Sequence, residues 1–327
     1  YLFGAFICGF SVCMLNTVVN PMLNLLGGGG NKGNQLIQTG GALNSLSGTL
    51  TPLFVGALIG TVTAQTAMTD VAPLLFIAMG VFASAFIIIS FIAIPEPHLR
   101  KGNVEKEKFA HSPWHFRHTL LGVVGIFIYV GIEIGIPGTL NFYLADSSEK
   151  GAGLLVDGAA IGGAISAIYW LLMLVGRSAS SAISGKISSR TQLIVVSATA
   201  ICFVLIAIIT PKEVTLSMPG YSVDKGFQMA QVPVSALFLV LCGLCTSVMW
   251  GGIFNLAVEG LGKYTAQASG IFMMMVVGGG VLPLVQQFIS DAVGYMASYW
   301  LIIVLLAYLL FYGLVGCKNV NKDIPVE

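Results

Sequence analysis

Nine long apolar stretches constrain this chain more than any other feature of its sequence. A helix that crosses a lipid bilayer needs about 20 consecutive, mostly apolar residues. Such stretches fold as helices because the bilayer core offers no water to backbone N–H and C=O groups. We therefore predict an all-α polytopic membrane protein, with spans at 1–26, 37–60, 71–95, 118–145, 160–185, 191–210, 232–258, 265–290 and 296–317.

The composition agrees with a surface covered largely by lipid. Of the 327 residues, 56% are hydrophobic and only 9% are charged, whereas soluble domains carry roughly 25% charged residues. A net charge of +1 argues against a nucleic-acid partner, which requires a basic surface. The sequence has no recognisable nucleophile-and-base set or phosphate-binding loop, so we expect neither an enzyme nor a bound cofactor. The cysteines, including the pair Cys242 and Cys245, are expected to pack as small apolar side chains.

Lysine and arginine residues between the spans gather on one side of the membrane. Eleven lie in one set of alternating loops, and three, Lys150, Lys212 and Lys225, lie in the other set. Positive loops stay in the cytoplasm. The first span is therefore expected to run from outside to inside, in the inner (plasma) membrane, with a cytoplasmic C-terminus.

The charged connection at 96–118 divides the spans into three and six. A weak repeat relates the first span to the seventh, and the chain opens in an apolar run without an initiator Met. We therefore expect a piece whose beginning is missing. Residues 1–95 would be the last three helices of an N-terminal six-helix bundle, and 119–327 a C-terminal six-helix bundle with a short tail. The connection contains all four histidines, His98, His111, His115 and His118, and is interpreted as a solvated linker rather than a metal site.

Several segments, in order along the chain, resemble the fucose/glucose/galactose:proton symporter family of the major facilitator superfamily. They are "NTVVNPMLNLLGGGG", "GGALNSLSGTLTPL", "IYVGIEIG", "IYWLLMLVGR", "IFNLAVEGLGKYTAQASG" and "VVGGGVLPLVQQFISDAVG". The resemblance places the nine spans as the fourth to twelfth of twelve. It implies a monomer that takes up a hexose with a proton by alternating access, through a site between two bundles at mid-membrane. At Asn16 the chain departs from the fucose member, which has a coupling glutamate there.

Polar side chains inside the spans are the candidate substrate ligands, because polar groups in hydrocarbon need partners and face protein or a wet path. Asn16 and Asn20 share one helix face with Asn24, which is expected to brace the helix end. The glycines at 27–30 are expected to turn the chain after this helix. Asn44, Asn141 and Gln286 match or neighbour polar positions of the family. The alternative for each amide is a hydrogen bond between helices.

Glu133 lies near the middle of the fourth span. A charged residue at that depth marks an ion or substrate path by default, so we predict a substrate contact and the proton-coupling acid. The alternative is a structural hydrogen bond to a neighbouring helix. Pro137, four residues further on, is expected to break or bend the helix. Trp170 and Trp250 also lie at mid-span, where a ring could stack on a sugar. Trp300, near a span end, is interpreted as part of the interfacial aromatic belt.

Arg177, Glu259 and Lys263 are expected near the cytoplasmic side as gate or bracing residues that form a conformation-dependent ion-pair set. A constitutive salt bridge and simple anchoring remain alternatives. The "GGG" at 278–280 is interpreted as a close helix contact rather than a ligand site. The predicted function is a proton-coupled hexose transporter. A non-transporting sugar sensor and a drug or metabolite exporter of the same fold are the alternatives.

Overall fold

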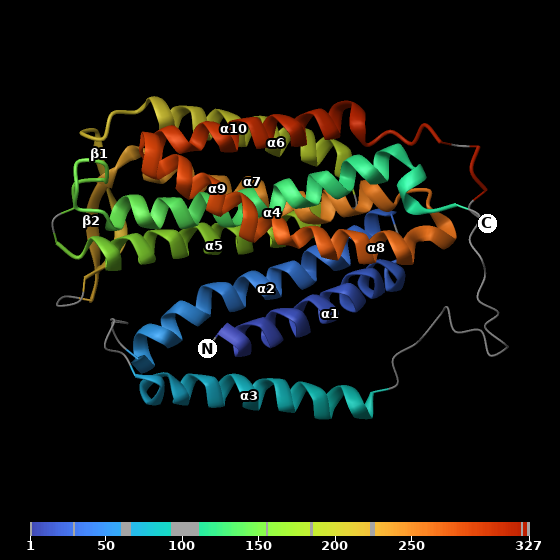
Figure 1. Ribbon diagram of the computed structural model, residues 1–327, viewed down its shortest axis with the longest axis horizontal. Helices are drawn as coiled ribbons and strands as arrows, with labels where there is room; N and C mark the ends of the chain where they lie inside the picture. The colour runs from blue at the N-terminus through green and yellow to red at the C-terminus, as the bar shows by residue number, and fades with distance from the viewer. Residues whose placement is uncertain are drawn as a thin grey trace. The chain divides into compact units, whose positions relative to one another are not determined.

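A computed structural model describes residues 2–28, 30–59, 67–92, 111–154, 156–183, 186–222, 226–321 and 323–325. The predicted all-α membrane class is confirmed (Figure 1). The elements are α1 (Leu2–Leu26), α2 (Gly30–Ile59), α3 (Met68–Phe91), η1 (Pro113–His115), α4 (Arg117–Ala145), α5 (Gly158–Ile183), α6 (Ser189–Ile209), β1 (Thr215–Ser222), β2 (Gly226–Pro233), α7 (Val234–Val258), η2 (Gly262–Tyr264), α8 (Thr265–Met274), η3 (Met275–Val277), α9 (Gly278–Val293), α10 (Tyr295–Phe311) and the π-helical turn η4 (Tyr312–Gly316).

Each of the nine expected spans coincides with a helix or a helix pair. Within the described residues, seven helical segments are long and apolar enough to cross a membrane. They are Val71–Phe91, Arg117–Ala145, Gly158–Ile183, Ser189–Ile209, Val234–Val258, Gly262–Val293 and Tyr295–Gly316. Helix α1 contributes a shorter apolar stretch, Phe6–Val19. Gly27 and Gly28 form the turn that was expected after α1. Gly28 has a φ of +72°, which suits a residue without a side chain.

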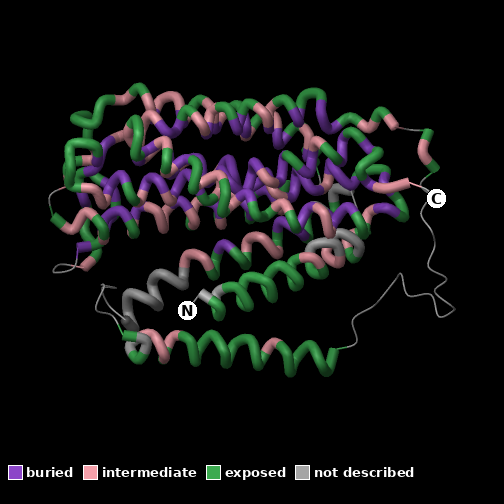
Figure 2. The backbone as a smooth tube through the Cα atoms, viewed as in Figure 1, coloured by how far each residue is buried: buried purple, intermediate pink, exposed green. Residues whose placement is uncertain are grey.

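The chain divides into two compact units by contact. The first contains Tyr1–Leu46 and His111–Glu327, and the second contains Ser47–Ala110, which holds the rest of α2 and all of α3. In the first unit, α4 and α7 form the centre of the bundle (Figure 2). In the most apolar 18-residue stretch of each helix, 67% of the residues are buried in α4 and 72% in α7, but only 33% in α5 and 33% in α6.

The eighth span is interrupted, whereas the fourth is continuous. Helix α4 runs without a break through Pro137, so of the break or bend expected there, the break is absent and the bend stays a prediction. The proline still removes one N–H, so the Glu133 carbonyl loses its helical donor. In the eighth span a 3₁₀ turn, Met275–Val277, separates α8 from α9.

Glycines bring α9 against α4. A Cβ on Gly278 would overlap the carbonyl oxygen of Phe127, and a Cβ on Gly279 would lie 2.7 Å from Val130 Cγ1. A Cβ on Gly131 would overlap Leu282. The predicted helix contact is confirmed for Gly278 and Gly279, whereas Gly280 has open space.

An antiparallel hairpin, β1 and β2, joins α6 to α7 and was not expected from the sequence. Its buried side rests on the start of α5, where Ser222 Oγ donates to Asp157 Oδ2 at 2.6 Å. Asp157 has a φ of +54°, a left-handed conformation that β-branched residues avoid.

We expect Asp157→Val to destabilise the protein by roughly 2 kcal/mol, because it combines left-handed strain with loss of the Ser222 hydrogen bond. Asp157→Asn, which tolerates this φ and retains an acceptor, should cost less than half as much. Thermal unfolding of the two variants in detergent measures the difference. Equal midpoints for both variants would contradict the strain argument.

Candidate functional site

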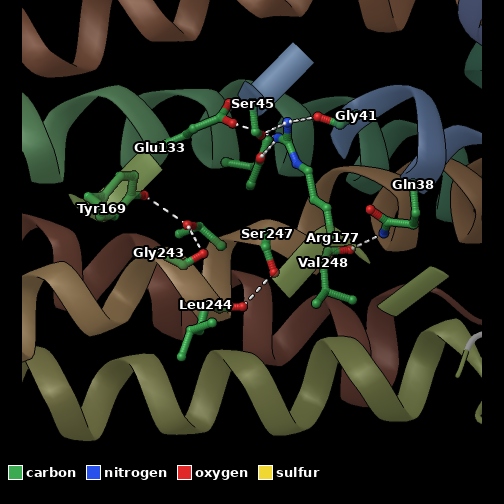
Figure 3. A network of polar contacts seen from close by, with 12 residues as sticks. Gln38, Gly41, Ser45, Glu133, Tyr169, Arg177, Gly243, Leu244, Ser247 and Val248 are labelled. Carbon is green, nitrogen blue, oxygen red and sulfur yellow. Dashed lines mark hydrogen bonds and ion pairs between the residues drawn. The ribbon is translucent and has the colours of Figure 1, made fainter. Parts of the chain in front are cut away.

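A buried ion pair lies at the centre of the first unit. Arg177 of α5 donates through Nη2 to Glu133 Oε1 of α4 at 2.8 Å (Figure 3). The side chains are only 6% and 13% exposed, respectively. Two charges so far from water are tolerated only when they are paired and hydrogen-bonded. The pair therefore accounts for how two charged residues fit within spans that are otherwise apolar.

The two terminal nitrogens of Arg177 serve different helices. Nη2 donates to Glu133 and, at 3.3 Å, to the hydroxyl of Tyr129, both on α4. Nη1 donates to the carbonyl oxygen of Gly41 and to Ser45 Oγ on α2, each at 2.8 Å. A Cβ on Gly41 would lie 3.2 Å from Arg177 Cδ, so the glycine permits this close approach. The guanidinium thus joins α2, α4 and α5 at one point.

Further polar contacts extend along the same part of α2. Gln38 Nε2 donates to the Val248 carbonyl of α7 at 3.1 Å. Thr39 Oγ1 and Ser181 Oγ share a hydrogen bond at 2.9 Å. Helix α2 therefore meets α5 and α7 through side-chain hydrogen bonds (Figure 3), which can be exchanged for bonds to water at a small net cost, unlike a buried apolar seam.

Aromatic rings adjoin the ion pair. Tyr129 lies one helical turn before Glu133 and is fully buried, and its ring centroid is 6.1 Å from that of Trp250 on α7. Trp170 meets Tyr169 edge to face at 5.7 Å, and Tyr169 shares a 2.8 Å hydrogen bond with Thr246. Both tryptophans are partly buried. The structure brings Trp250, through Tyr129, next to Glu133 and Arg177.

Two further candidate amides lie elsewhere around α4, Gln286 on the neighbouring helix α9 and Asn141 on α4 itself. Gln286 is 1% exposed, and its Nε2 is 3.5 Å from Ser298 Oγ of α10. Its Oε1 faces Gly135, where a Cβ would come within 2.5 Å. Asn141 Oδ1 is buried against Gly162 of α5 and has no hydrogen-bond partner among the residues that the structure describes. These positions suit hydrogen bonds between helices as well as ligand contacts, so both roles stay predictions.

The asparagines of α1 and α2 that were predicted as sugar contacts differ from these two amides in their exposure, where the structure describes it. Asn16 and Asn44 are exposed on α1 and α2. The backbones of Asn20 and Asn24 are helical, but their side chains lie outside the described residues. Helix α1 meets α8 through Cys13 Sγ, which is 3.9 Å from the Met273 carbonyl. The proposed sugar contacts of these amides remain untested.

The expected ion-pair set at the cytoplasmic side differs from the observed contacts. Arg177 lies six residues inside the end of α5 and pairs with Glu133 rather than Glu259. The backbone carbonyl of Glu259 is 3.0 Å from His118 Nε2, and the ammonium of Lys263 is 5.7 Å from the centroid of the Tyr264 ring. Arg177 was expected near the membrane surface, whereas it belongs to the buried pair. The conformation-dependent set stays a prediction.

The histidines and cysteines are the potential metal ligands and reactive thiols of the chain. Among the described residues, no three His, Cys, Asp or Glu side chains are placed to hold a metal ion, and His98 lies outside those residues. His111 and His115 meet edge to face at 5.7 Å. Cys242, Cys245 and Cys317 are buried and free, as packing residues would be. Burial raises the pKa of the Cys317 thiol, which keeps it protonated.

Three residues of the site, Tyr129, Ser45 and Gly41, were not predicted from the sequence. Tyr129 could have been predicted, because a residue four positions before Glu133 shares its helix face. Ser45 and Gly41 could not, since small residues are frequent in such helices. A buried arginine also needs several acceptors, but their positions depend on how the helices are rotated.

A bundle of membrane helices with a buried acid–base pair at its centre defines a polytopic membrane protein of the secondary-transporter class. Comparisons with known proteins narrow this class. A glucose/galactose transporter of Brucella abortus is 30% identical over 323 residues, which cover 98% of this chain and 72% of that protein. The L-fucose-proton symporter of Escherichia coli is 36% identical over 61 residues, 19% of this chain and 14% of that one. No family model matches the sequence.

Solved structures agree with the fold. The E. coli fucose:proton symporter FucP has a TM-score of 0.73 with this chain at 18% identity, and the match covers 93% of this chain and 74% of that one. FucP in its outward conformation gives 0.71, at the same identity and with 93% and 73% covered. The chain belongs to the family of the Brucella abortus glucose/galactose transporter. It shares the fold of FucP, which is a transporter of the major facilitator superfamily.

Proposed function

We propose that the chain forms the greater part of a secondary active transporter that takes up a hexose, glucose or galactose, together with a proton. Family membership supports the substrate class, because the long match is to a protein named as a glucose/galactose transporter. The observation that carries the mechanism is the buried Glu133–Arg177 pair, since an ionisable group among membrane helices has a function by default. Sugar sensing and drug export remain outcomes of the test.

In this proposal each part of the site has a separate task. Glu133 exchanges the proton, and Arg177 balances its charge. Trp250, supported by Tyr129, offers a ring face to the apolar C–H side of a sugar. Amides such as Asn16 and Asn44 bind its hydroxyls. Asn20, Asn141, Trp170 and Gln286 are further proposed contacts, and Glu259 and Lys263 are proposed to brace the cytoplasmic end.

The setting of the site is part of the same proposal. Residues 1–95 and 119–327 belong to two bundles that rock about the site, and 96–118 links them. The protein is a monomer in the inner (plasma) membrane, with its C-terminus in the cytoplasm, as the distribution of lysine and arginine favours.

Counterflow tests this function. Vesicles that contain the full-length protein are loaded with unlabelled sugar, and entry of labelled glucose, galactose or fucose is measured. We expect glucose and galactose to exchange. Trp250→Ala should raise the half-saturation concentration about tenfold through loss of the stacking face, whereas Trp300→Ala, at a 52% exposed position, should leave it unchanged. A sensor would exchange no sugar, and an exporter would ignore all three.

A further inference from the structure

The π-helical turn η4, at the end of α10, has no part in the proposed function. In an α-helix the N–H groups of Cys317 and Lys318 would donate to the carbonyls of Gly313 and Leu314. Both N–H groups bind other carbonyls of η4 instead, at 2.8 and 3.4 Å. Turns of this kind are rare and recur at functional sites. This one leaves two backbone acceptors open to a side chain.

Arg190, in the first turn of α6, binds both of these acceptors. Its Nε donates to the Gly313 carbonyl at 2.9 Å and its Nη2 to the Leu314 carbonyl at 2.6 Å. A guanidinium has five N–H donors, and the other three have no partner among the residues that the structure describes. No described carboxylate forms an ion pair with Arg190. The backbone of η4 therefore fixes the guanidinium, while its charge and three donors remain available to a ligand.

Two lysines accompany Arg190, and the two segments that hold these cations contain no acid. Residues 183–194 and 311–321 include Lys186, Arg190 and Lys318 but neither Asp nor Glu. The side chains of both lysines are exposed. The positive charge at this end of the bundle therefore has no counter-charge within these two segments.

Arg190 and Lys318 lie close to the same sulfur atom. Burial raises the pKa of the Cys317 thiol, and the charges of Arg190 and Lys318 both act against that rise. The charge of Glu259 also reaches this thiol, with the opposite effect. Within the described part of the chain, Glu259 forms no ion pair with either cation. Both charges are therefore free to meet an anion from outside the protein.

Large apolar side chains are exposed beside the cations. Leu314 and Val315 of η4 are 45% and 50% exposed. Phe311, at the end of α10, and Ile187, just before α6, are exposed as well. These side chains continue the outer surface of α6 and α10, which pack side by side (Figure 1). Cations at the edge of an apolar helix surface suit a ligand with a negative head and apolar tails.

We propose that Lys186, Arg190 and Lys318 bind the phosphate group of one anionic phospholipid, whose acyl chains lie along α6 and α10. The fork of N–H donors on an arginine matches phosphate oxygens, and the two lysines add charge. A zwitterionic lipid brings its own cation and is repelled by the three on the protein. In the orientation proposed above, this lipid belongs to the cytoplasmic leaflet. It would hold the start of α6 against the end of α10.

Thermal unfolding of the full-length protein in detergent tests the site. The protein is heated with phosphatidylglycerol or with phosphatidylcholine at the same mole fraction. A ligand that binds the folded state raises the midpoint, so phosphatidylglycerol should raise it by about 4 °C more than phosphatidylcholine does. Equal midpoints with the two lipids would overturn the proposal.

Variants locate the effect, because the difference between the two lipids is measured within each variant. Lys186→Gln with Lys318→Gln should reduce this difference to less than about half, since two of three charges are lost while Arg190 keeps its hydrogen bonds. Adding Arg190→Gln should abolish it. If the difference stayed at the parent value in both variants, the three cations would not form the site.

Lys150→Gln with Lys212→Gln is the matched control. It also removes two lysines, each of which donates to a single backbone carbonyl in an exposed contact, to Asp291 and to Glu149. These lysines lie in the other set of loops, so this variant should keep the full difference between the lipids. An equal loss in the control and in the Lys186 and Lys318 variant would show a general effect of net charge and overturn the proposal.

Inorganic phosphate separates a lipid site from a site for a free ion. At the same concentration it should raise the midpoint by less than about 1 °C, because it lacks the apolar tails. If it matched phosphatidylglycerol, the lipid would be rejected as the ligand. Native mass spectra should also show one more phosphatidylglycerol retained by the parent than by the triple variant, and equal retention would contradict the site. None of these measurements uses a sugar, so their outcome is independent of the proposed transport.

Discussion

Substitution of Arg177 by glutamine should destabilise the protein by about 3–5 kcal/mol, the cost typical of breaking a buried ion pair by removal of one partner. Glutamine retains donors but not the charge, so Glu133 would remain in a site where it is 13% exposed and has lost its counter-ion. The bonds to Gly41 and Ser45 on α2 would be weakened in the same step. Unfolding in mixed micelles, followed with increasing denaturant, measures the change.

Arg190 provides a matched control for this experiment. It also joins two helical segments, donating to the Gly313 and Leu314 carbonyls at 2.9 and 2.6 Å, but among the described residues it forms no ion pair with a carboxylate. Arg190→Gln should therefore cost only about 1 kcal/mol, the net value of ordinary hydrogen bonds. If both arginine variants lost equal stability, the charge of Glu133 would not be the reason.

The double variant Arg177→Gln/Glu133→Gln separates the pair from its surroundings. Each single change leaves one buried charge, whereas the double change leaves none, so its cost should be well below the sum of the two single costs. The double variant should fold but fail to accumulate sugar against a gradient, because the proposed proton-exchanging acid, Glu133, has been removed. Additive costs would show that the two residues act independently.

The sequence was sufficient to predict the membrane helices, because the length and the apolar composition of a segment determine whether it forms one. Runs of about 20 apolar residues have few alternatives in a bilayer, and each expected span corresponds to helix in the structure. The hairpin was missed because its strands, "TLSMPGYS" and "GFQMAQVP", each contain a proline and several polar side chains. Their alternation of exposed and buried positions is visible only once α5 is there to cover one side.

The ion pair shows what sequence spacing cannot supply. Glu133 and Arg177 are 44 positions apart, and helical periodicity indicates which residues share a face but not which faces meet. A general rule was nevertheless available, because an acid and a base that both fall inside apolar spans should neutralise each other. The expectation of an ion-pair set that includes Glu259 and Lys263 followed from placing Arg177 at the surface. The contacts with Gly41 and Ser45 depend on helix rotation and required the structure.

A single methyl group on Gly278 should be among the most damaging small changes in the chain. Its Cβ would overlap the Phe127 carbonyl oxygen, which belongs to the α4 backbone and cannot swing aside as a side chain can. Gly131 and Gly279 have no spare room along the same α4–α9 contact. We therefore expect Gly278→Ala to cost roughly 3 kcal/mol, at the upper end of overpacking effects, and to shift the helix that holds Glu133.

Gly280→Ala is the matched control, because it adds the same methyl group two residues away, where nothing lies within 4 Å. Alanine favours a helix over glycine by about 1 kcal/mol, so this variant should be as stable as the parent or slightly more so. The yield of monodisperse protein and the thermal midpoint in detergent compare the two, and counterflow shows whether the displaced α4 still supports exchange. A Gly278→Ala protein as stable as Gly280→Ala would mean that α9 can move away from α4 without loss. The close contact would then not be what holds Glu133 in place.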